Sequence, residues 1–309
     1  MLSAFIEKLE ADGTHVYSPD PFVLLCGGER TNVDVPKPKS LRDAFLKSDF
    51  YGSIENAEIR QIEDIREFFD KDSPYKELFT FERHIAQLSD LVLLFSESPG
   101  SFAELGAFAS HADIASKTLV VIQQKYLSKS SFIAQGPIAY LNDLSERSVF
   151  SLTNASIGLR GNQFASVKPE KLLSLLTGPV GDRLEESKES RKLRKSSFSH
   201  RCRLYIAFLR EFHVLKDVEL SQLFQAFGIK ITKSSLNQIA FCCKCVDWSK
   251  TAKLGFDRIH FALDVKKEAA KFNLHGDFGD RVKRRLEIRA HWSKNDPDRL
   301  EARNEAILP

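Results

Sequence analysis

The chain has 309 residues, of which 42% are apolar and 28% are charged, a composition typical of globular proteins. No apolar run approaches the roughly 20 residues that a membrane helix needs, and the N-terminal MLSAFIEKLEADG lacks the basic and apolar regions of a signal peptide. The cysteine count is odd, and Cys242, Cys243 and Cys245 lie too close together to pair with one another. We therefore expect a reduced, cytoplasmic protein that does not contact a membrane.

Charge is unevenly distributed along the chain. The formal net charge is +3, but residues 182–309 contain 27 Lys and Arg against 18 Asp and Glu, a net charge of +9. Residues 1–181 carry the compensating −6. An acidic first half and a basic second half predict two modules with different binding partners, and the partner of the second is expected to be anionic.

Residues 1–178 alternate between helical and strand patterns. An amphipathic helix is predicted at Leu2–Leu9. Three apolar runs and the segment EIRQI then predict strands, with helices between them. The strands are expected at residues 21–25, 58–62, 91–95 and 118–122, and the helices at 41–47, 77–89 and 102–116. Apolar strands separated by helices are typical of a parallel sheet covered on both faces, so the predicted fold class is a doubly wound, Rossmann-like α/β domain.

The rest of the chain is expected to divide into three parts. Residues 179–200 are densely charged with few hydrophobes, which predicts a linker or a solvated helix. Residues 201–266 predict a helix, a second helix ending at Gly228, a third beginning after Thr232, and a hairpin around residues 256–261. This order is that of a winged helix-turn-helix domain. Residues 267–309 are predicted to form a basic C-terminal tail, amphipathic in part.

Ligands of open α/β sheets bind at the carboxyl ends of the strands. Three predicted loops meet there, at residues 26–29, 63–64 and 96–101. The glycines at 27 and 28 would let a ligand approach the backbone. The loop at 96–101 begins a helix, whose free N–H groups and dipole favour an anion. Asp90, at the start of a strand, either contacts a ligand or caps the preceding helix. The candidate substrate-binding residues are Cys26, Gly27, Gly28, Glu63, Asp64, Asp90, Glu97, Ser98, Gly100 and Ser101.

Glu104 lies about one turn into the helix that follows the third strand. Its sequence neighbours are small or apolar, which predicts a tight and partly dry setting. Two interpretations are open: Glu104 completes a capping box with Ser101, or its carboxylate faces the crevice and takes part in catalysis. Gly106 in the same helix costs about 1 kcal/mol relative to Ala, so we expect close packing at this point.

Three segments carry a resemblance to a known family. The segments LFSESPGSFAELGAF (94–108), FVLLCGGE (22–29) and SKSSFIAQGP (128–137) resemble the nucleoside 2-deoxyribosyltransferases. They resemble more closely the deoxyribosyltransferase-like effectors encoded beside retron reverse transcriptases. The resemblance covers roughly residues 20–140, and the winged-helix order predicted for 201–266 agrees with it.

The resemblance implies that Glu104 is the nucleophile of an N-glycosidase. A carboxylate below C1′ can stabilise or trap the oxocarbenium-like state of such a reaction. The transferases place an aspartate six residues before the nucleophile to handle the proton of the base, where this chain has Ser98 beside Glu97. A leaving group that needs no proton, such as the nicotinamide of NAD, therefore becomes attractive. The implied reaction is hydrolysis of NAD or of a (deoxy)nucleotide, with NAD as a substrate and no cofactor.

The same resemblance implies a toxic effector of an antiphage retron system, held by the reverse transcriptase and its multicopy single-stranded DNA. Phosphate contacts are expected from basic residues around the predicted helix-turn-helix and wing, and a solvated basic face without a partner is the alternative. Self-association is left open, because the transferases are oligomers. The candidate nucleic-acid-binding residues are Lys230, Lys233, Lys244, Lys250, Lys253 and Arg258.

Other functions are weighed against this one. The histidines lack the i, i+4 spacing of a helical metal site, and the cysteines at 242–245 have no second pair, so no metal site is predicted. A nucleotide-sensing, DNA-binding regulator without turnover is one rival. A metabolic deoxyribosyltransferase with an accessory domain is another, and Ser98 disfavours it.

Overall fold

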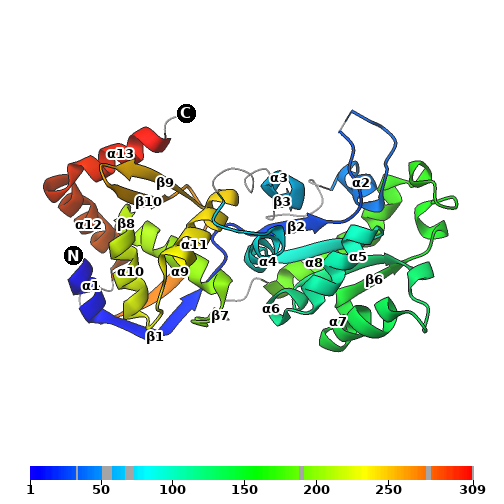
Figure 1. Cartoon of the computed structure of the whole chain (residues 1–309), viewed down its shortest axis with the longest axis horizontal. Helices are drawn as coiled ribbons and strands as arrows, with labels where there is room; N and C mark the ends of the chain where they lie inside the picture. Colours follow the sequence, from blue (N-terminus) through cyan, green and yellow to red (C-terminus); the bar gives the residue numbers. More distant parts are fainter. Residues whose placement is uncertain (33, 51–57, 67–72, 188–190, 276–279, 308–309) are drawn as a thin grey trace. The chain divides into compact units, whose positions relative to one another are not determined.

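The computed structural model of the chain describes residues 1–32, 34–50, 58–66, 73–187, 191–275 and 280–307 (Figure 1). The chain forms two compact units. The α/β unit consists of Pro21–Arg66 and Ser89–Lys188, and the helical unit consists of Met1–Asp20, Glu67–Leu88 and Glu189–Pro309. These units differ from the continuous domains expected from the sequence, because two N-terminal segments pack with the C-terminal half.

The α/β unit contains a five-stranded parallel sheet in the order β3-β2-β4-β5-β6. Its strands are β2 (Phe22–Cys26), β3 (Glu58–Gln61), β4 (Leu91–Ser96), β5 (Thr118–Gln123) and β6 (Val149–Leu152). β2, β4 and β5 are buried along their whole length, as strands of a sheet covered on both faces must be. The predicted parallel α/β class and its first four strands are confirmed, and β6 is an additional strand.

Helices cover both faces of this sheet. α2 (Leu41–Leu46) and α8 (Pro169–Ser187) share one core with Leu93 and Phe95 of β4. α5 (Pro99–Ala109) packs on β4 and β5, and its buried Leu105 and Phe108 lie outside that core, so α5 covers the opposite face. The shorter elements of the unit are α3 (Ile62–Arg66), α6 (Ala112–Ala115), η1 (Gln124–Tyr126), η2 (Ala134–Ile138), α7 (Ala139–Leu144), η3 (Glu146–Ser148), η4 (Ala155–Ile157) and η5 (Phe164–Ser166).

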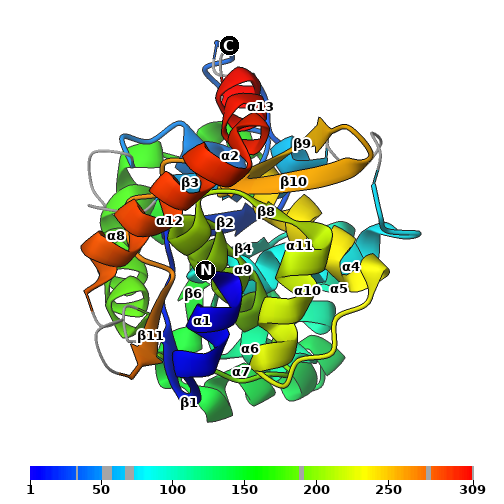
Figure 2. The same cartoon turned by 90° about the vertical axis from the view of Figure 1, so that its left-hand side faces the viewer.

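The helical unit contains two three-stranded antiparallel sheets, ordered β11-β1-β7 and β8-β10-β9 (Figure 2). The helices and the hairpin expected within 201–266 are present as α9, α10, α11 and β9–β10. The elements of the unit are α1 (Leu2–Lys8), β1 (Leu9–Val16), α4 (Leu78–Leu88), β7 (Arg191–Lys192), α9 (Phe198–Phe212), β8 (Leu215–Lys216), α10 (Asp217–Ala226), α11 (Lys233–Cys245), β9 (Ser249–Leu254), β10 (Asp257–Ala262), β11 (Ala270–Leu274), α12 (Arg281–Asn295) and α13 (Pro297–Ile307). No described helix has the length and apolar character that crossing a bilayer requires.

The C-terminal segment 267–309 is not the tail that its basic composition suggests. β11 pairs with β1, with Ala270 opposite Val16. α12 buries Ile288 and Trp292, and the indole N–H of Trp292 donates to the carbonyl of Phe212 at 2.8 Å. α13 packs along the β9–β10 hairpin, as Figure 2 shows. Ile288 and Trp292, at i, i+4 spacing, form the apolar seam that holds the basic helix α12 in the unit.

The segment 179–200, expected to be a linker, is largely structured. α8 continues through it as far as Ser187 although Pro179 lies inside the helix. Four buried residues at i, i+4 spacing form the apolar seam of α8: Leu172, Leu176, Val180 and Leu184. Asp182, Glu185 and Glu186 are exposed on this part of the helix, and the continuing seam explains why the helix does not stop at the change in composition.

α4 is present where the sequence predicts it, but it belongs to the helical unit. It buries Phe81, Ile85, Ala86 and Leu88 and packs against α9 and α11. His84 stacks on Phe198 with ring centroids 3.7 Å apart, and its Nδ1 lies 2.7 Å from the hydroxyl of Tyr75. Burial lowers the pKa of His84 to about 4, so this imidazole is neutral at physiological pH.

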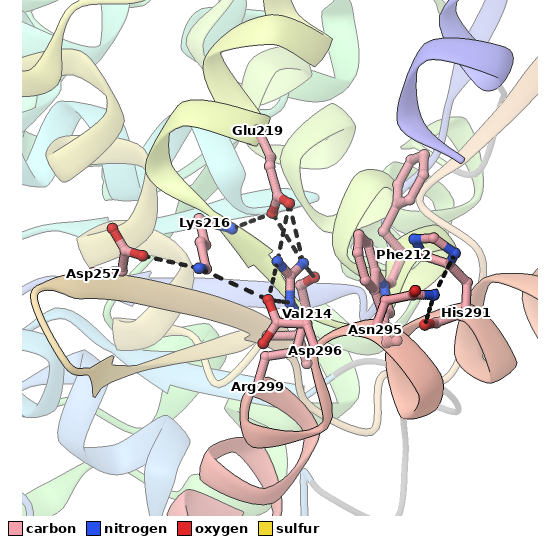
Figure 3. A network of polar contacts seen from close by, with 10 residues as sticks. Phe212, Val214, Lys216, Glu219, Asp257, His291, Asn295, Asp296 and Arg299 are labelled. Carbon is pink, nitrogen blue, oxygen red and sulfur yellow. Dashed lines mark hydrogen bonds and ion pairs between the residues drawn. The ribbon is translucent and has the colours of Figure 1, made fainter.

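A polar network joins α13 to the start of α10 (Figure 3). Arg299 is buried and donates to the carboxylates of Glu219 at 3.1 Å and Asp296 at 2.8 Å, and its guanidinium lies 3.8 Å from the ring centroid of Trp292. Glu219 also accepts the backbone N–H of Lys216 at 2.7 Å, which caps α10. Arg299 of α13 thus binds Glu219, the residue whose carboxylate caps the N-terminus of α10.

A second, more deeply buried network joins α9 to α12. Glu211 is fully buried and pairs with Arg284 and, at 3.2 Å, with Arg285. Arg285 in turn binds Glu268 at 2.8 Å, and Glu268 also accepts from Arg210 at 3.1 Å. The buried carboxylate of Glu211 is therefore compensated by two guanidinium groups, as a charge away from water requires.

The carboxylate of Glu268 predicts a pH dependence of stability. Burial opposes ionisation, but Arg285 and Arg210 outweigh it and lower the pKa of Glu268 to about 2, from an ordinary value of 4.5. A depressed pKa stabilises the fold fully above the unfolded value and loses that contribution as the pH falls towards 2. Because the side chain is one quarter exposed, we expect at most about 3 kcal/mol, of which about 2 kcal/mol is lost between pH 5 and pH 3.

Urea denaturation across this pH range measures the effect. Glu268→Gln should unfold with a free energy that falls less steeply than that of the wild type on acidification, by about 2 kcal/mol. Glu287→Gln, at an exposed position of α12, is the matched control and should follow the wild type. Parallel pH profiles for all three proteins would contradict the assignment.

Candidate functional site

The strand order changes direction between β2 and β4. From β2 the chain moves outward to β3, and then returns to β4 on the other side of β2. Ligands of doubly wound sheets bind at such a switch point, beside the carboxyl ends of the strands. The carboxyl ends of β2 and β4 lead into residues 26–28 and 97–101, two of the three loops that the sequence predicts for the site.

Glu97 holds these two loops together. One oxygen of its carboxylate accepts the backbone N–H groups of Gly28 and Arg42, both at 3.1 Å, and the other accepts that of Leu41 at 2.6 Å. Burial raises the pKa of Glu97, and the three backbone hydrogen bonds oppose that rise. The carboxyl group of Glu97 therefore accepts free N–H groups at the first turn of α2 and connects β2, β4 and α2.

Close packing within the fold requires glycine at positions 27 and 28. A Cβ on Gly27, whose φ is +152°, would lie 2.8 Å from the Cβ of Phe95. A Cβ on Gly28 would lie 2.8 Å both from Oε1 of Glu97 and from the Cβ of Ser40. Close packing of the loop thus requires glycine whether or not a ligand approaches its backbone.

Gly28→Ala should therefore destabilise the α/β unit. We expect the unfolding free energy to fall by about 1–3 kcal/mol, because the new methyl group displaces the carboxylate of Glu97 or the side chain of Ser40. Thermal and urea unfolding measure the change. The control is Gly178→Ala in α8, where a Cβ meets no atom within 4 Å and a gain of about 0.5–1 kcal/mol is expected. Equal behaviour of the two variants would contradict this account of the loop.

Ser98 and Ser101 cap α5. Ser98 is the N-cap residue and its hydroxyl accepts the backbone N–H of Ser101 at 3.3 Å. The hydroxyl of Ser101 accepts the backbone N–H of Ser98 at 2.9 Å, which completes a capping box. Gly100 is exposed, and a Cβ there would meet no atom within 4 Å. The capping interpretation of Glu104 is wrong, because the box is formed by Ser98 and Ser101.

Glu104 lies in the second turn of α5 and is half-buried. Among its neighbours, Leu105 is buried in the core, whereas Gly106 is exposed and has open space beside its Cα. The close packing expected at Gly106 is absent among the described residues. Glu104 is thus a half-buried carboxylate in the first helix after β4.

Glu63 and Asp64 lie in α3, directly after β3. Both oxygens of Glu63 accept from one guanidinium nitrogen of Arg42 at 2.8 Å, and Arg42 is almost fully buried. Asp64 pairs with Arg30 at 2.6 Å in an exposed position. The structure thus brings Glu63 to the carboxyl edge of the sheet, where it compensates a buried cation.

Cys26 and Asp90 occupy different ends of their strands. Cys26 ends β2 and is fully buried, so its side chain packs inside the unit. Asp90 precedes β4, at the amino edge of the sheet, and its carboxylate accepts the backbone N–H of Phe22 at 3.1 Å. The backbone N–H of Asp90 donates to the carbonyl of Phe22 at 2.9 Å. Asp90 is therefore remote from the loops at the carboxyl edge, and the expectation that it joins them is not met.

The sequence analysis misses two residues of this edge. Arg42 follows the N-cap of α2 and pairs with Glu63, and the predicted helix at 41–47 gives no sign of its burial. Ser96 ends β4, is fully buried, and has no hydrogen-bond partner for its hydroxyl among the described residues. Alternation along the strand puts Ser96 opposite the face that carries Phe95, hence on the face covered by α5. The sequence pattern that could have identified Ser96 is a serine at the end of an apolar strand.

The predicted nucleic-acid-binding residues fall into two groups. The lysines are all exposed on or near α11 and the β9–β10 hairpin: Lys230, Lys233, Lys244, Lys250 and Lys253. Arg258 instead binds both carboxylate oxygens of Asp217, at 3.0 and 3.2 Å. Asp217 also lies 2.5 Å from Nε2 of the buried His260. Arg258 is thus committed to an internal pair, whereas the lysines are free to meet an anion.

Within the described ranges, no group of His, Cys, Asp and Glu side chains is arranged to hold a metal ion. All five cysteines are buried thiols. Burial raises the pKa of Cys245 to about 12, and Cys242 contacts the hydroxyl of Tyr75 at 3.0 Å. These thiols act as small core residues.

Comparison with known proteins gives one family and two curated relatives. A family model described as "STM3845 retron effector protein" matches residues 38–251, more than half of the chain. An Escherichia coli protein named "Retron Ec86 putative ribosyltransferase/DNA-binding protein" is 33% identical over 127 residues, 41% of this chain and 39% of the relative. A second, "Retron Ec73 putative ribosyltransferase/DNA-binding protein", also from Escherichia coli, is 28% identical over 151 residues, 48% and 46% of the two chains. The aligned parts span less than half of each relative.

Proposed function

We propose that this chain, which belongs to the STM3845 retron effector family, is the toxic component of an antiphage retron system and cleaves an N-glycosidic bond in NAD or a (deoxy)nucleotide. The observation that carries the proposal is the position of Glu104. Glu104 is half-buried in α5, about one helical turn after the helix begins, and α5 follows β4 at the switch point of the parallel sheet. Ser98 and Ser101, not Glu104, cap this helix. The names of the two curated relatives, which include a ribosyltransferase, support the same class of reaction.

The chemistry follows from the carboxylate. An oxygen of Glu104 attacks C1′ while the C1′–N bond breaks, and the bonding electrons leave with the base. Water then attacks C1′ of the glycosyl ester, loses a proton, and releases both the sugar and the carboxylate. The buried hydroxyl of Ser96, on the sheet face covered by the same helix, is a candidate for binding a sugar hydroxyl.

The leaving group is expected to be nicotinamide. A neutral base needs a proton when it leaves, and the two polar residues nearest to the expected donor position are Glu97 and Ser98. Both oxygens of Glu97 accept backbone N–H groups, and Ser98 is the cap of α5. The hydroxyl of Ser98 donates to that of Ser101 at 3.2 Å, so both side chains are engaged within the fold, which disfavours a base that needs a proton. A pyridinium base leaves as neutral nicotinamide without a proton, and NAD is therefore the favoured substrate.

Direct assay tests the proposal. The purified full chain, alone and with the reverse transcriptase and its multicopy single-stranded DNA, is incubated with NAD and with a panel of nucleotides and deoxynucleotides. Release of free base is followed by chromatography. Nicotinamide release supports the proposal. Binding of a nucleotide without release of base, under all these conditions, would favour the sensing regulator instead, and transfer of deoxyribose to a second base would favour the transferase.

The helical unit supplies the second part of the proposal. The sequence of elements α9, β8, α10, α11 and the β9–β10 hairpin is the order of a winged helix-turn-helix domain, with α11 as the recognition helix. Exposed lysines lie on α11 and on the hairpin. We assign this surface to the multicopy single-stranded DNA held by the reverse transcriptase, and both relatives carry "DNA-binding" in their names.

Charge reversal tests this surface. Replacing Lys233, Lys244 and Lys253 by Glu should weaken association with the reverse transcriptase–DNA complex and leave base release by the isolated chain unchanged. Each lost phosphate contact should lower the slope of log K against log salt by about 0.7–0.9. Lys171→Glu, exposed on α8 of the α/β unit, is the control. An unchanged affinity and salt slope in the triple variant would leave protein–protein contacts as the tether.

A further inference from the structure

Phe256 is a large apolar side chain held in solvent. It lies at the tip of the β9–β10 hairpin and is fully exposed. In contrast, Ile259 and Phe261 of β10 are buried in a small core to which Leu300 of α13 contributes. Phe256 is therefore outside the apolar core of the hairpin, and burial of its ring does not contribute to the stability of the unit.

The turn that carries Phe256 is short and defined. Leu254 pairs with Asp257, so Gly255 and Phe256 form a two-residue connection. Gly255 has a φ of +58°, a conformation that two-residue hairpin turns require and that glycine adopts without strain. The ring is thus presented on a tight turn, so little backbone freedom is lost when the ring binds a partner.

The surroundings of the ring favour an anionic partner. Lys250 and Lys253 are exposed on the same hairpin, and Lys244 is exposed on α11, which packs against β9. The acidic residue next to the ring, Asp257, is paired with Lys216 at 2.9 Å. An exposed aromatic ring on an element that also carries exposed lysines is a combination with which proteins bind nucleic acids through stacked bases.

We infer that Phe256 stacks on an unpaired base of a folded nucleic acid, so that the hairpin distinguishes structured single strands from plain duplex. The inference rests on the proposed function of the helical unit and names the feature that this surface recognises. A duplex presents its bases already stacked, and a ring that enters it must first separate a base step at a free-energy cost comparable to the gain. An unpaired base exposes its face without that cost, so stacking on Phe256 favours an unpaired base over a duplex.

The test uses the full chain and three DNA probes measured by fluorescence anisotropy. The probes are a hairpin with an unpaired loop, the same hairpin with an abasic loop, and its stem as a blunt duplex. Phe256→Ala should weaken binding of the first probe about 5- to 150-fold, equivalent to about 1–3 kcal/mol for one stacked base. The other two probes should bind as tightly as they bind the wild type. Val218→Ala, at another exposed apolar residue of the same unit, is the control.

A second variant reports the contact directly. Phe256→Trp should bind the looped hairpin and show quenched tryptophan emission, because Trp248 and Trp292 are buried and the new indole is the exposed one. Equal weakening of all three probes by Phe256→Ala would overturn the inference in favour of a duplex wedge. If reversal of the lysines weakens binding while Phe256→Ala does not, the inference fails and the proposed function stands. A wild-type chain that binds none of the probes, alone or with the reverse transcriptase, overturns both.

Discussion

Glu104→Gln is expected to abolish release of the base and leave the chain folded. Glutamine keeps the size of the side chain but has no negative charge, so it neither attacks C1′ nor stabilises an oxocarbenium-like state. We expect the rate to fall by at least about 10³-fold, as it does when a nucleophile is removed. Stability should change little, because the capping box of α5 consists of Ser98 and Ser101. Chromatographic rate measurements and thermal unfolding of the same samples check both parts.

A matched carboxylate controls for the loss of charge. Glu170 is exposed in the first turn of α8, in the same unit, and Glu170→Gln should keep the wild-type rate. In cells, Glu104→Gln should also remove toxicity, whereas Glu170→Gln should not. A Glu104→Gln protein that retains more than a few per cent of the wild-type rate would deprive the proposed mechanism of its nucleophile.

Glu211→Leu is expected to destabilise the helical unit by about 3–5 kcal/mol. The substitution removes a buried carboxylate that Arg284 binds, and Arg285 loses one of its two acidic partners. Removing one partner of a buried ion pair costs more than the net attraction of the pair, because the remaining charge loses compensation away from water. Urea denaturation followed by circular dichroism measures this loss, which is a large share of the roughly 5–15 kcal/mol by which an ordinary protein is stable.

The double variant Glu211→Leu/Arg284→Met separates these two causes. Replacing both charges by apolar groups of similar size should recover most of the lost stability, because no buried charge then lacks a partner. Arg284→Met alone should be destabilising, since it leaves Glu211 with only Arg285. Additive effects of the two single substitutions would contradict the coupling that the structure indicates.

Local patterns in the sequence predict elements better than they predict partners. The apolar strands β2, β4 and β5 are recognised because central strands of a parallel sheet are apolar on both faces. The apolar face of α4 predicts the helix and its burial, but it does not predict which elements cover that face. The same amphipathic pattern would suit a helix lying on the sheet, so the sequence could not assign α4 to α9 and α11.

The candidate site shows the same division. The sequence predicts the two loops at the switch point and the carboxylate of Glu104, because strand ends and glycines are local signals. It does not predict that Glu97 accepts three backbone N–H groups, because Gly28, Leu41 and Arg42 are more than 50 residues away in the chain. Side chains that appear available for a ligand in the sequence can already be bound within the fold.

The interleaving of the two units limits how such a protein can change over generations. The chain crosses from one unit to the other after Asp20, Arg66, Leu88 and Lys188. A single recombination point anywhere along the gene therefore separates parts of at least one unit, and an exchanged C-terminal half would arrive without the helices and strand that complete its core. The α/β unit and the helical unit are therefore inherited together, and new specificity in either unit is expected to arise from substitutions within it.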